Sequence, residues 1–252
     1  MFLKTQDADL FITAFGNGPR TFVAHGGWVG SGELWQLPFE ALSRTWRTVS
    51  YDHRGTGATA NRAGRITFEL LVQDLFRVLD ALAIDKCVLA GESSGASVVL
   101  EAALRQPHRF TGLVIVDGRY ATGRGATTSR IEACKTNFEA TMDAFVKGCI
   151  PEEDCEAERR WAKRIVMRSD AASAVQLLEL MDDVDVEARL EQLTMPTLIL
   201  HGTRDLITPI AVSEELARKL PNNRFVKIEG AGHVPTMTRP DAVVQAIAQY
   251  FD

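Results

Sequence analysis

The stretch that decides the fold is Cys87-Val88-Leu89-Ala90-Gly91-Glu92-Ser93-Ser94-Gly95. Its first four residues form a short apolar run, which indicates a buried strand. The next five read G-x-S-x-G, and a segment of helical period, residues 96–105, follows them directly. A serine between two glycines at a strand-to-helix junction predicts a sharp turn that lifts its hydroxyl above the sheet. Ser93 is therefore the candidate nucleophile.

Short apolar runs alternate with longer segments of helical period on both sides of this turn. The alternation is typical of a mostly parallel sheet with helices on both faces, so we predict an α/β fold. Eight strands are expected, the first two of them antiparallel, at residues 2–10, 11–15, 21–24, 48–51, 87–90, 112–116, 197–200 and 224–228. Core-facing helices are expected at residues 68–82, 96–105, 210–220 and 242–250.

The alternation stops between residues 121 and 193, where only charged, amphipathic stretches occur, such as 131–146 and 158–167. We predict one α/β core made of residues 1–120 and 194–252, with residues 121–193 inserted as a helical cap. Ligands of open parallel sheets bind beyond the carboxyl ends of the strands. An insertion at this point is therefore expected to cover the binding site.

Composition excludes several classes of protein. The 252 residues are 46% hydrophobic and 24% charged, as in soluble globular enzymes. A net charge of -5 without a basic run argues against nucleic acid as a partner. No apolar leader or segment of about 20 apolar residues is evident, so we expect a cytoplasmic protein with no membrane partner. The four cysteines lack paired CxxC spacing, which favours reduced thiols and no metal site, with a Cys149–Cys155 bridge expected only in an oxidising compartment.

A serine hydroxyl is a weak nucleophile at neutral pH and needs a base, and the base needs an acid to orient it. His233, in Gly230-Ala231-Gly232-His233, follows the last predicted strand. Asp205, in His201-Gly202-Thr203-Arg204-Asp205, follows the strand at 197–200, and His201 is assigned to that strand's end. Both candidates stand at carboxyl ends of strands, as Ser93 does. Asp117, directly after the strand at 112–116, is the alternative acid.

Acyl transfer also needs backbone N–H groups aimed at the developing oxyanion, because this stabilisation is usually the largest catalytic contribution. His25-Gly26-Gly27-Trp28 follows the strand at 21–24 and supplies a glycine-rich loop at the same edge of the sheet. We expect the N–H of Gly27 and that of Ser94, next after the nucleophile, to form the oxyanion hole.

Aromatic and basic residues near these motifs have two interpretations each. Trp28 and Trp35 either line an acyl pocket or pack the loop and the helix after it. Arg119, Tyr120 and Arg124 either receive a substrate carboxylate or form a solvated edge of the cap.

Taken together, the motifs resemble the α/β-hydrolase superfamily over nearly the whole chain outside the cap. Residues 51–57, Tyr-Asp-His-Arg-Gly-Thr-Gly, resemble the turn after its fourth strand. Gly202-x-x-Asp205 before Pro209, and Gly230-x-Gly232-His233, resemble the acid and histidine turns of esterases, haloperoxidase-like perhydrolases and enol-lactone hydrolases. The order nucleophile, acid, histidine also agrees. Serine rather than aspartate at position 93 argues against epoxide opening or halide displacement.

The resemblance implies a serine hydrolase that cleaves a small carboxylic ester or lactone through an acyl-enzyme, without a cofactor. Two other functions fit the same residues: a ligand sensor that keeps the catalytic triad, and a perhydrolase in which peroxide replaces water. The sequence leaves the acyl and alcohol groups open, as well as the choice between monomer and homodimer.

Overall fold

A nine-stranded, mostly parallel sheet forms the centre of the protein, and our computed structural model describes residues 1–120, 127–184 and 186–251. The strand order is β1-β2-β4-β3-β6-β7-β8-β9, with β5 paired to β2. Their bounds are β1 Phe2–Lys4, β2 Ala8–Phe15, β3 Arg20–His25, β4 Trp46–Tyr51, β5 Ala60–Asn61, β6 Cys87–Glu92, β7 Phe110–Val116, β8 Thr197–Gly202 and β9 Asn223–Ile228. The prediction of a mostly parallel sheet is confirmed, and its first two strands are antiparallel.

The expected strand count of eight was wrong by one. The additional strand, β5, pairs only two residues with β2, which is too short to show any alternation of apolar residues. The first strand boundary also differs from the prediction, because the Thr5 hydroxyl accepts a hydrogen bond from the N–H of Ala8 at 2.9 Å and turns the chain there.

The parallel strands end at one edge of the sheet. In the register, His25 lies opposite Gly91, Glu92 opposite Val116, and Gly202 opposite Ile228. The loops that follow β3, β6, β7, β8 and β9 therefore leave the sheet side by side.

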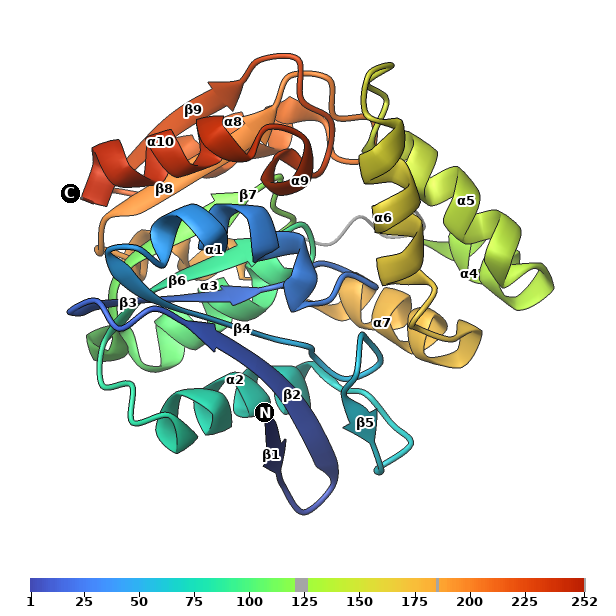
Figure 1. The fold of residues 1–252 in the computed structure, drawn as a ribbon, viewed down its shortest axis with the longest axis horizontal. Coiled ribbons are helices and arrows are strands. Elements are labelled where there is room, and N and C mark those ends of the chain that lie inside the picture. Colours follow the sequence, from blue (N-terminus) through green and yellow to red (C-terminus); the bar gives the residue numbers. More distant parts are fainter. Residues whose placement is uncertain (121–126, 185, 252) are drawn as a thin grey trace.

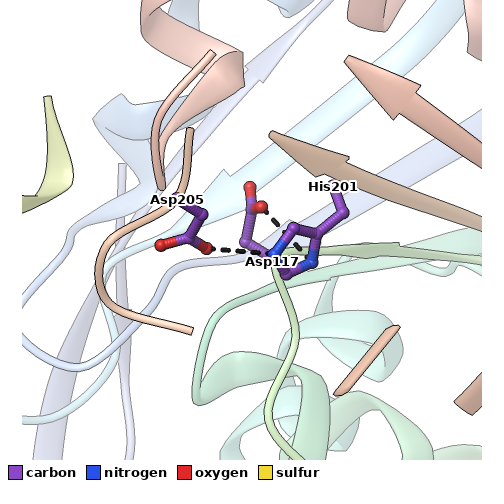
Figure 2. Close-up of side chains that lie close together, drawn as sticks. All are labelled: Asp117, His201 and Asp205. Carbon is purple, nitrogen blue, oxygen red and sulfur yellow. Dashed lines mark ion pairs between the residues drawn. The ribbon is translucent and has the colours of Figure 1, made fainter. Parts of the chain in front are cut away.

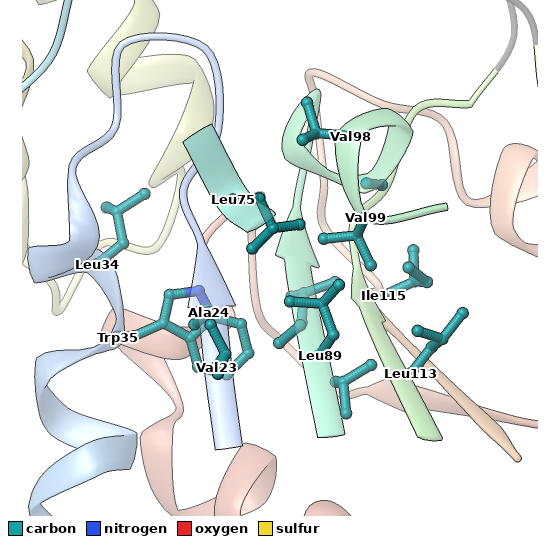
Figure 3. Close-up of a cluster of buried hydrophobic side chains, with 14 of the residues drawn as sticks. Val23, Ala24, Leu34, Trp35, Leu75, Leu89, Val98, Val99, Leu113 and Ile115 are labelled. Carbon is teal, nitrogen blue, oxygen red and sulfur yellow. The ribbon is translucent and has the colours of Figure 1, made fainter. Parts of the chain in front are cut away.

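Helices cover both faces of the sheet (Figure 1). On one face α1 (Gln36–Leu42) packs against α10 (Pro240–Phe251), and on the other α2 (Phe68–Ala81) packs against α3 (Gly95–Arg105). The helix α8 (Ile210–Lys219) packs on β8 and β9, so all four predicted core-facing helices are present. Short helical turns are η1 (Gly32–Trp35), η2 (Pro107–Arg109), η3 (Glu187–Gln192) and α9 (Pro235–Thr238). Figure 3 shows strand residues such as Leu89 and Ile115 packed between these layers.

Between β7 and β8, the described residues form four α-helices: α4 (Thr128–Thr136), α5 (Phe138–Cys149), α6 (Glu156–Val166) and α7 (Ala171–Asp183). They gather on the side where the parallel strands end (Figure 1). The stretch expected to be helical at 131–146 is divided at Asn137, whose side chain accepts a hydrogen bond from the N–H of Ala140 and caps α5. None of the described helices has the length and hydropathy needed to cross a bilayer.

Candidate active site

Ser93 occupies a strained turn between β6 and α3. Its φ is +54°, in the left-handed region that residues with a side chain rarely adopt, and its N–H donates to the carbonyl of Val116 at 2.9 Å. The flanking glycines are needed for space. A Cβ at Gly95 would lie 2.2 Å from the carbonyl oxygen of Gly26, and one at Gly91 would lie 2.8 Å from that of Gly95. The sequence G-x-S-x-G therefore follows from how closely the backbone packs here.

A continuous hydrogen-bonded chain joins three of the predicted site residues. Ser93 Oγ lies 2.8 Å from His233 Nε2, and His233 Nδ1 lies 2.7 Å from Asp205 Oδ2. The other oxygen of Asp205 accepts from the N–H groups of Ile207 at 2.7 Å and Thr208 at 3.0 Å. With Nδ1–H donating to the carboxylate, Nε2 is left to accept the proton of the serine hydroxyl.

The charge of Asp205 is stabilised although its side chain is only 1% exposed. Burial alone would raise the pKa of this carboxyl. The electrostatic interaction with His233 and its hydrogen bond, with the two backbone N–H groups, instead hold the pKa of Asp205 below its ordinary value. Asp205 therefore faces the imidazole as a carboxylate.

The alternative acid, Asp117, has a different environment. It lies directly after β7 with a φ of +48°, is fully buried, and accepts a hydrogen bond from the N–H of Gly202 at 2.9 Å. Its second oxygen has no hydrogen-bond partner among the described residues. Burial, together with the nearby Asp205 carboxylate, raises the pKa of Asp117 well above its ordinary value. Asp117 therefore holds its proton more readily than Asp205 does.

His201 lies between these two carboxyl groups (Figure 2). Its Nε2 is 3.3 Å from Asp205 Oδ2 and 3.0 Å from the carbonyl of Thr208, and its Nδ1 is 2.7 Å from the hydroxyl of Ser213. Burial lowers the pKa of His201. Asp117, His201 and Asp205 are also the one group in the described ranges that could offer a metal ion three ligand atoms within 4.8 Å of one another. The imidazole nitrogens of His201, both oxygens of Asp205 and one oxygen of Asp117 are engaged in hydrogen bonds, whereas the second oxygen of Asp117 has no partner among the described residues.

The glycine-rich loop after β3 lies against the nucleophile. A Cβ at Gly27 would be 3.1 Å from Ser93 Cβ, and within the described part of the chain neither Gly27 nor Ser94 donates its N–H to an acceptor. His53 stacks on His25 with ring centroids 4.9 Å apart and contacts the carbonyl of Gly27 through Nε2 at 2.8 Å. Burial, and then the neighbouring His53, lower the pKa of His25 to about 3, so the loop rests on a neutral ring.

Two pockets meet at Trp28, whose Nε1 donates to the carbonyl of Ala174 in α7 at 2.8 Å. The Ser93 pocket is lined by Gly27, Trp28, Val29, Gly30, Leu34, Glu92, Ser93, Phe145, Val146, Cys149, Ala162, Val166, His233 and Val234. The Ser94 pocket is lined by His25, Trp28, His53, Phe68, Leu71, Ser94, Gly95, Ser97, Val98, Leu177, Leu180, Met181 and Val184. Both are mainly apolar.

Glu92, the residue before the nucleophile, was not singled out from the sequence. It is 1% exposed, lines the Ser93 pocket, and its two oxygens lie 3.1 and 3.3 Å from the hydroxyl of Thr236 in α9. Burial raises the pKa of Glu92 to about 8, and the Thr236 hydrogen bond opposes this only in part. A protonated carboxyl group thus stands beside Ser93 at neutral pH.

The turn that carries His233 is also held by hydrogen bonds to residues between β7 and β8. The sequence analysis did not predict these hydrogen bonds. Glu152, fully buried, accepts a hydrogen bond from the N–H of Gly232 at 2.8 Å. The carbonyl of Cys149 accepts from the N–H of His233 at 2.8 Å. Both contacts join residues about 80 positions apart, so no local pattern could have revealed them.

Other candidates from the sequence lie elsewhere. Trp35 is fully buried beside Phe22 in the core, and Tyr120 is also buried. Arg124 lies outside the described residues. All four cysteines are free, Cys149 and Cys155 included.

Comparison with known proteins gives matches to hydrolases both in sequence and in fold. Residues 22–246 match the model of the alpha/beta hydrolase family. The chain is 27% identical over 245 residues to RutD of Caulobacter vibrioides, to which carbamate hydrolase activity is ascribed, covering 93% of this chain and 91% of that protein. It is 26% identical over 251 residues to the pimeloyl-acyl-carrier-protein methyl ester esterase of Nitrosomonas europaea, covering 94% and 97%. The enol-lactonase of Burkholderia xenovorans LB400 shares the fold, with a TM-score of 0.91 at 22% identity and 99% of both chains covered.

Proposed function

The chain belongs to the alpha/beta hydrolase family, and from that premise we propose that it is a serine hydrolase acting on a small carboxylic ester or lactone. The observation that carries the proposal is the hydrogen-bonded chain from Ser93 through His233 to Asp205. The names of two relatives, one to which carbamate hydrolase activity is ascribed and the other a methyl ester esterase, agree with hydrolysis at an acyl carbonyl carbon.

In the proposed reaction, Ser93 attacks the ester carbonyl while His233 Nε2 takes the hydroxyl proton. Asp205 stabilises the imidazolium that forms. The N–H groups of Gly27 and Ser94 would bind the oxyanion, and each such donor typically contributes about 3 kcal/mol. His233 then protonates the leaving alcohol, and water cleaves the acyl-enzyme by the same route in reverse.

The helices α4 to α7 would act as the cap over this chemistry, with residues 121–193 as its extent. Phe145 of α5 and Ala162 of α6 line the Ser93 pocket opposite the sheet residues. Their apolar side chains exclude water, which strengthens the electrostatic interactions within the site. A substrate with an apolar acyl chain fits this lining.

The test is hydrolysis of p-nitrophenyl butyrate by wild type and Ser93→Ala. We expect the variant to lose at least about 10⁴-fold in kcat/KM, because the nucleophile is gone while the pocket remains. Ser43→Ala, at the end of α1, is the matched control and should retain activity. Retained turnover by Ser93→Ala would refute the proposed nucleophile. Release of a single p-nitrophenol per chain by wild type would instead support the ligand-sensing function.

A further inference from the structure

We propose that Arg130 recognises a carboxylate at the far end of the acyl chain, so that the preferred substrates are half-esters of dicarboxylic acids. The inference rests on the proposed ester hydrolysis and specifies its substrate class.

Arg130 is a half-buried arginine on α4 that makes no ion pair within the described ranges. Its guanidinium lies 5.6 Å from the ring centroid of Trp28 and 5.4 Å from that of Phe145. These two rings contact each other edge to face at 4.9 Å. The aromatic faces hold the guanidinium in place without neutralising its charge, and its five N–H donors stay available to a carboxylate.

The surroundings of Arg130 favour an anion. It lines an open groove between α4, α5 and the loop after β8, together with Ser129, Ala133, Thr136, Asn137, Ala140, Thr141, Ala144, Phe145 and Ile207. Arg130 is the charged side chain of this lining, and the polar members are hydroxyls and an amide. No aspartate or glutamate of the described chain lines the groove with it. A carboxylate would therefore meet attraction from Arg130 here, with no negatively charged side chain among the lining residues that the structure describes.

The groove and the Ser93 pocket share the Phe145 side chain. The acyl carbon becomes bonded to Ser93 Oγ, and the adjoining pocket walls are apolar, including Val146 and Val166. Methylene groups of an acyl chain suit those walls. Because the guanidinium lies 5.4 Å from the centroid of the Phe145 ring, an acyl chain that extends past this ring would bring its terminal group near Arg130.

The experiment compares two p-nitrophenyl esters that differ at the chain end: the hexanoate, which ends in a methyl group, and the adipate half-ester, which ends in a carboxylate. In wild type we expect kcat/KM for the adipate ester to exceed that for the hexanoate by about tenfold, the value of one charge-assisted hydrogen bond of about 1.4 kcal/mol. Arg130→Gln should lose about tenfold on the adipate ester, mainly through KM, and less than twofold on the hexanoate. Arg130→Lys should keep part of the preference.

Lys135→Gln is the matched control, because it removes one positive charge from the same helix at an exposed residue paired with Glu132. It should leave the adipate preference intact. Free adipate should inhibit p-nitrophenyl butyrate hydrolysis competitively in wild type and about tenfold more weakly in Arg130→Gln. The inference is overturned if wild type does not prefer the adipate ester, or if Arg130→Gln slows both esters equally. Loss of both activities in Ser93→Ala tests the proposed function separately.

Discussion

Replacing Glu92 by Gln should make the stability of the protein less dependent on pH. The ordinary pKa of a glutamate is 4.5, and burial raises that of Glu92 to about 8. Between these values the folded state holds a proton that the unfolded state has released. The stability that protonated Glu92 contributes to the folded state is therefore fully present below about pH 4.5 and is lost as the pH rises through about 8.

The size of the effect follows from the same two values. Each pH unit in that interval costs about 1.4 kcal/mol of unfolding free energy, so at pH 7 the loss relative to acidic solution is about 3 kcal/mol. Glutamine has the same shape, keeps a hydrogen-bond acceptor for the Thr236 hydroxyl, and does not ionise. The variant should lack this dependence.

The assay is urea denaturation of wild type and Glu92→Gln at pH 5, 6, 7 and 8. We expect the unfolding free energy of wild type minus that of the variant to fall by roughly 3 kcal/mol from pH 5 to pH 7. Asp117, whose pKa is also raised by burial, destabilises with the same sign and is present in both proteins. Because the Glu92 charge also raises the pKa of Asp117, the difference includes the coupling between these two carboxyl groups. A difference that stays constant with pH would refute the reasoning.

The remaining predictions concern kcat/KM for p-nitrophenyl butyrate. Asp205→Asn should lose about 10⁴-fold, because the amide would impose the wrong tautomer on the histidine. Asp117→Asn should stay within a few-fold of wild type, because burial and the Asp205 carboxylate favour the uncharged form of this carboxyl; the reverse ranking would make Asp117 the acid. Gly27→Ala should lose roughly tenfold in kcat, because its Cβ would press on Ser93 from 3.1 Å and displace the reacting oxygen. An unchanged kcat in Gly27→Ala would show that this loop does not take part in the reaction.

The turn at Ser93 and the two residues joined to it by hydrogen bonds, His233 and Asp205, could be predicted because each depends on a local sequence pattern. Gly91, Ser93 and Gly95 are fixed by a single turn, and Asp205 and His233 each follow a strand whose apolar run is visible in the sequence. Parallel register then brings these strand ends to one edge, so their proximity required only the fold class.

The parts that could not be predicted depend on long-range contacts. The pKa of Glu92 is raised by burial, and its hydrogen-bond partner Thr236, which opposes this rise, is 144 positions away. The short strand β5 exists only because Ala8 and Asp9 lie beside it. Arg130 belongs to a stretch whose charged residues resemble any solvated helix, and only its stacking on Trp28 distinguishes it.

The left-handed backbone at Ser93 also has an evolutionary consequence. An L-residue in this conformation costs roughly 1–2 kcal/mol, whereas glycine adopts it freely. Under the proposed mechanism, position 93 is subject to two opposed selective pressures, one for a hydroxyl and one for an unstrained backbone. On the same premise, lineages that keep the hydrolase active retain serine against this thermodynamic bias, while copies released from that requirement are free to drift toward glycine and become more stable as they lose activity.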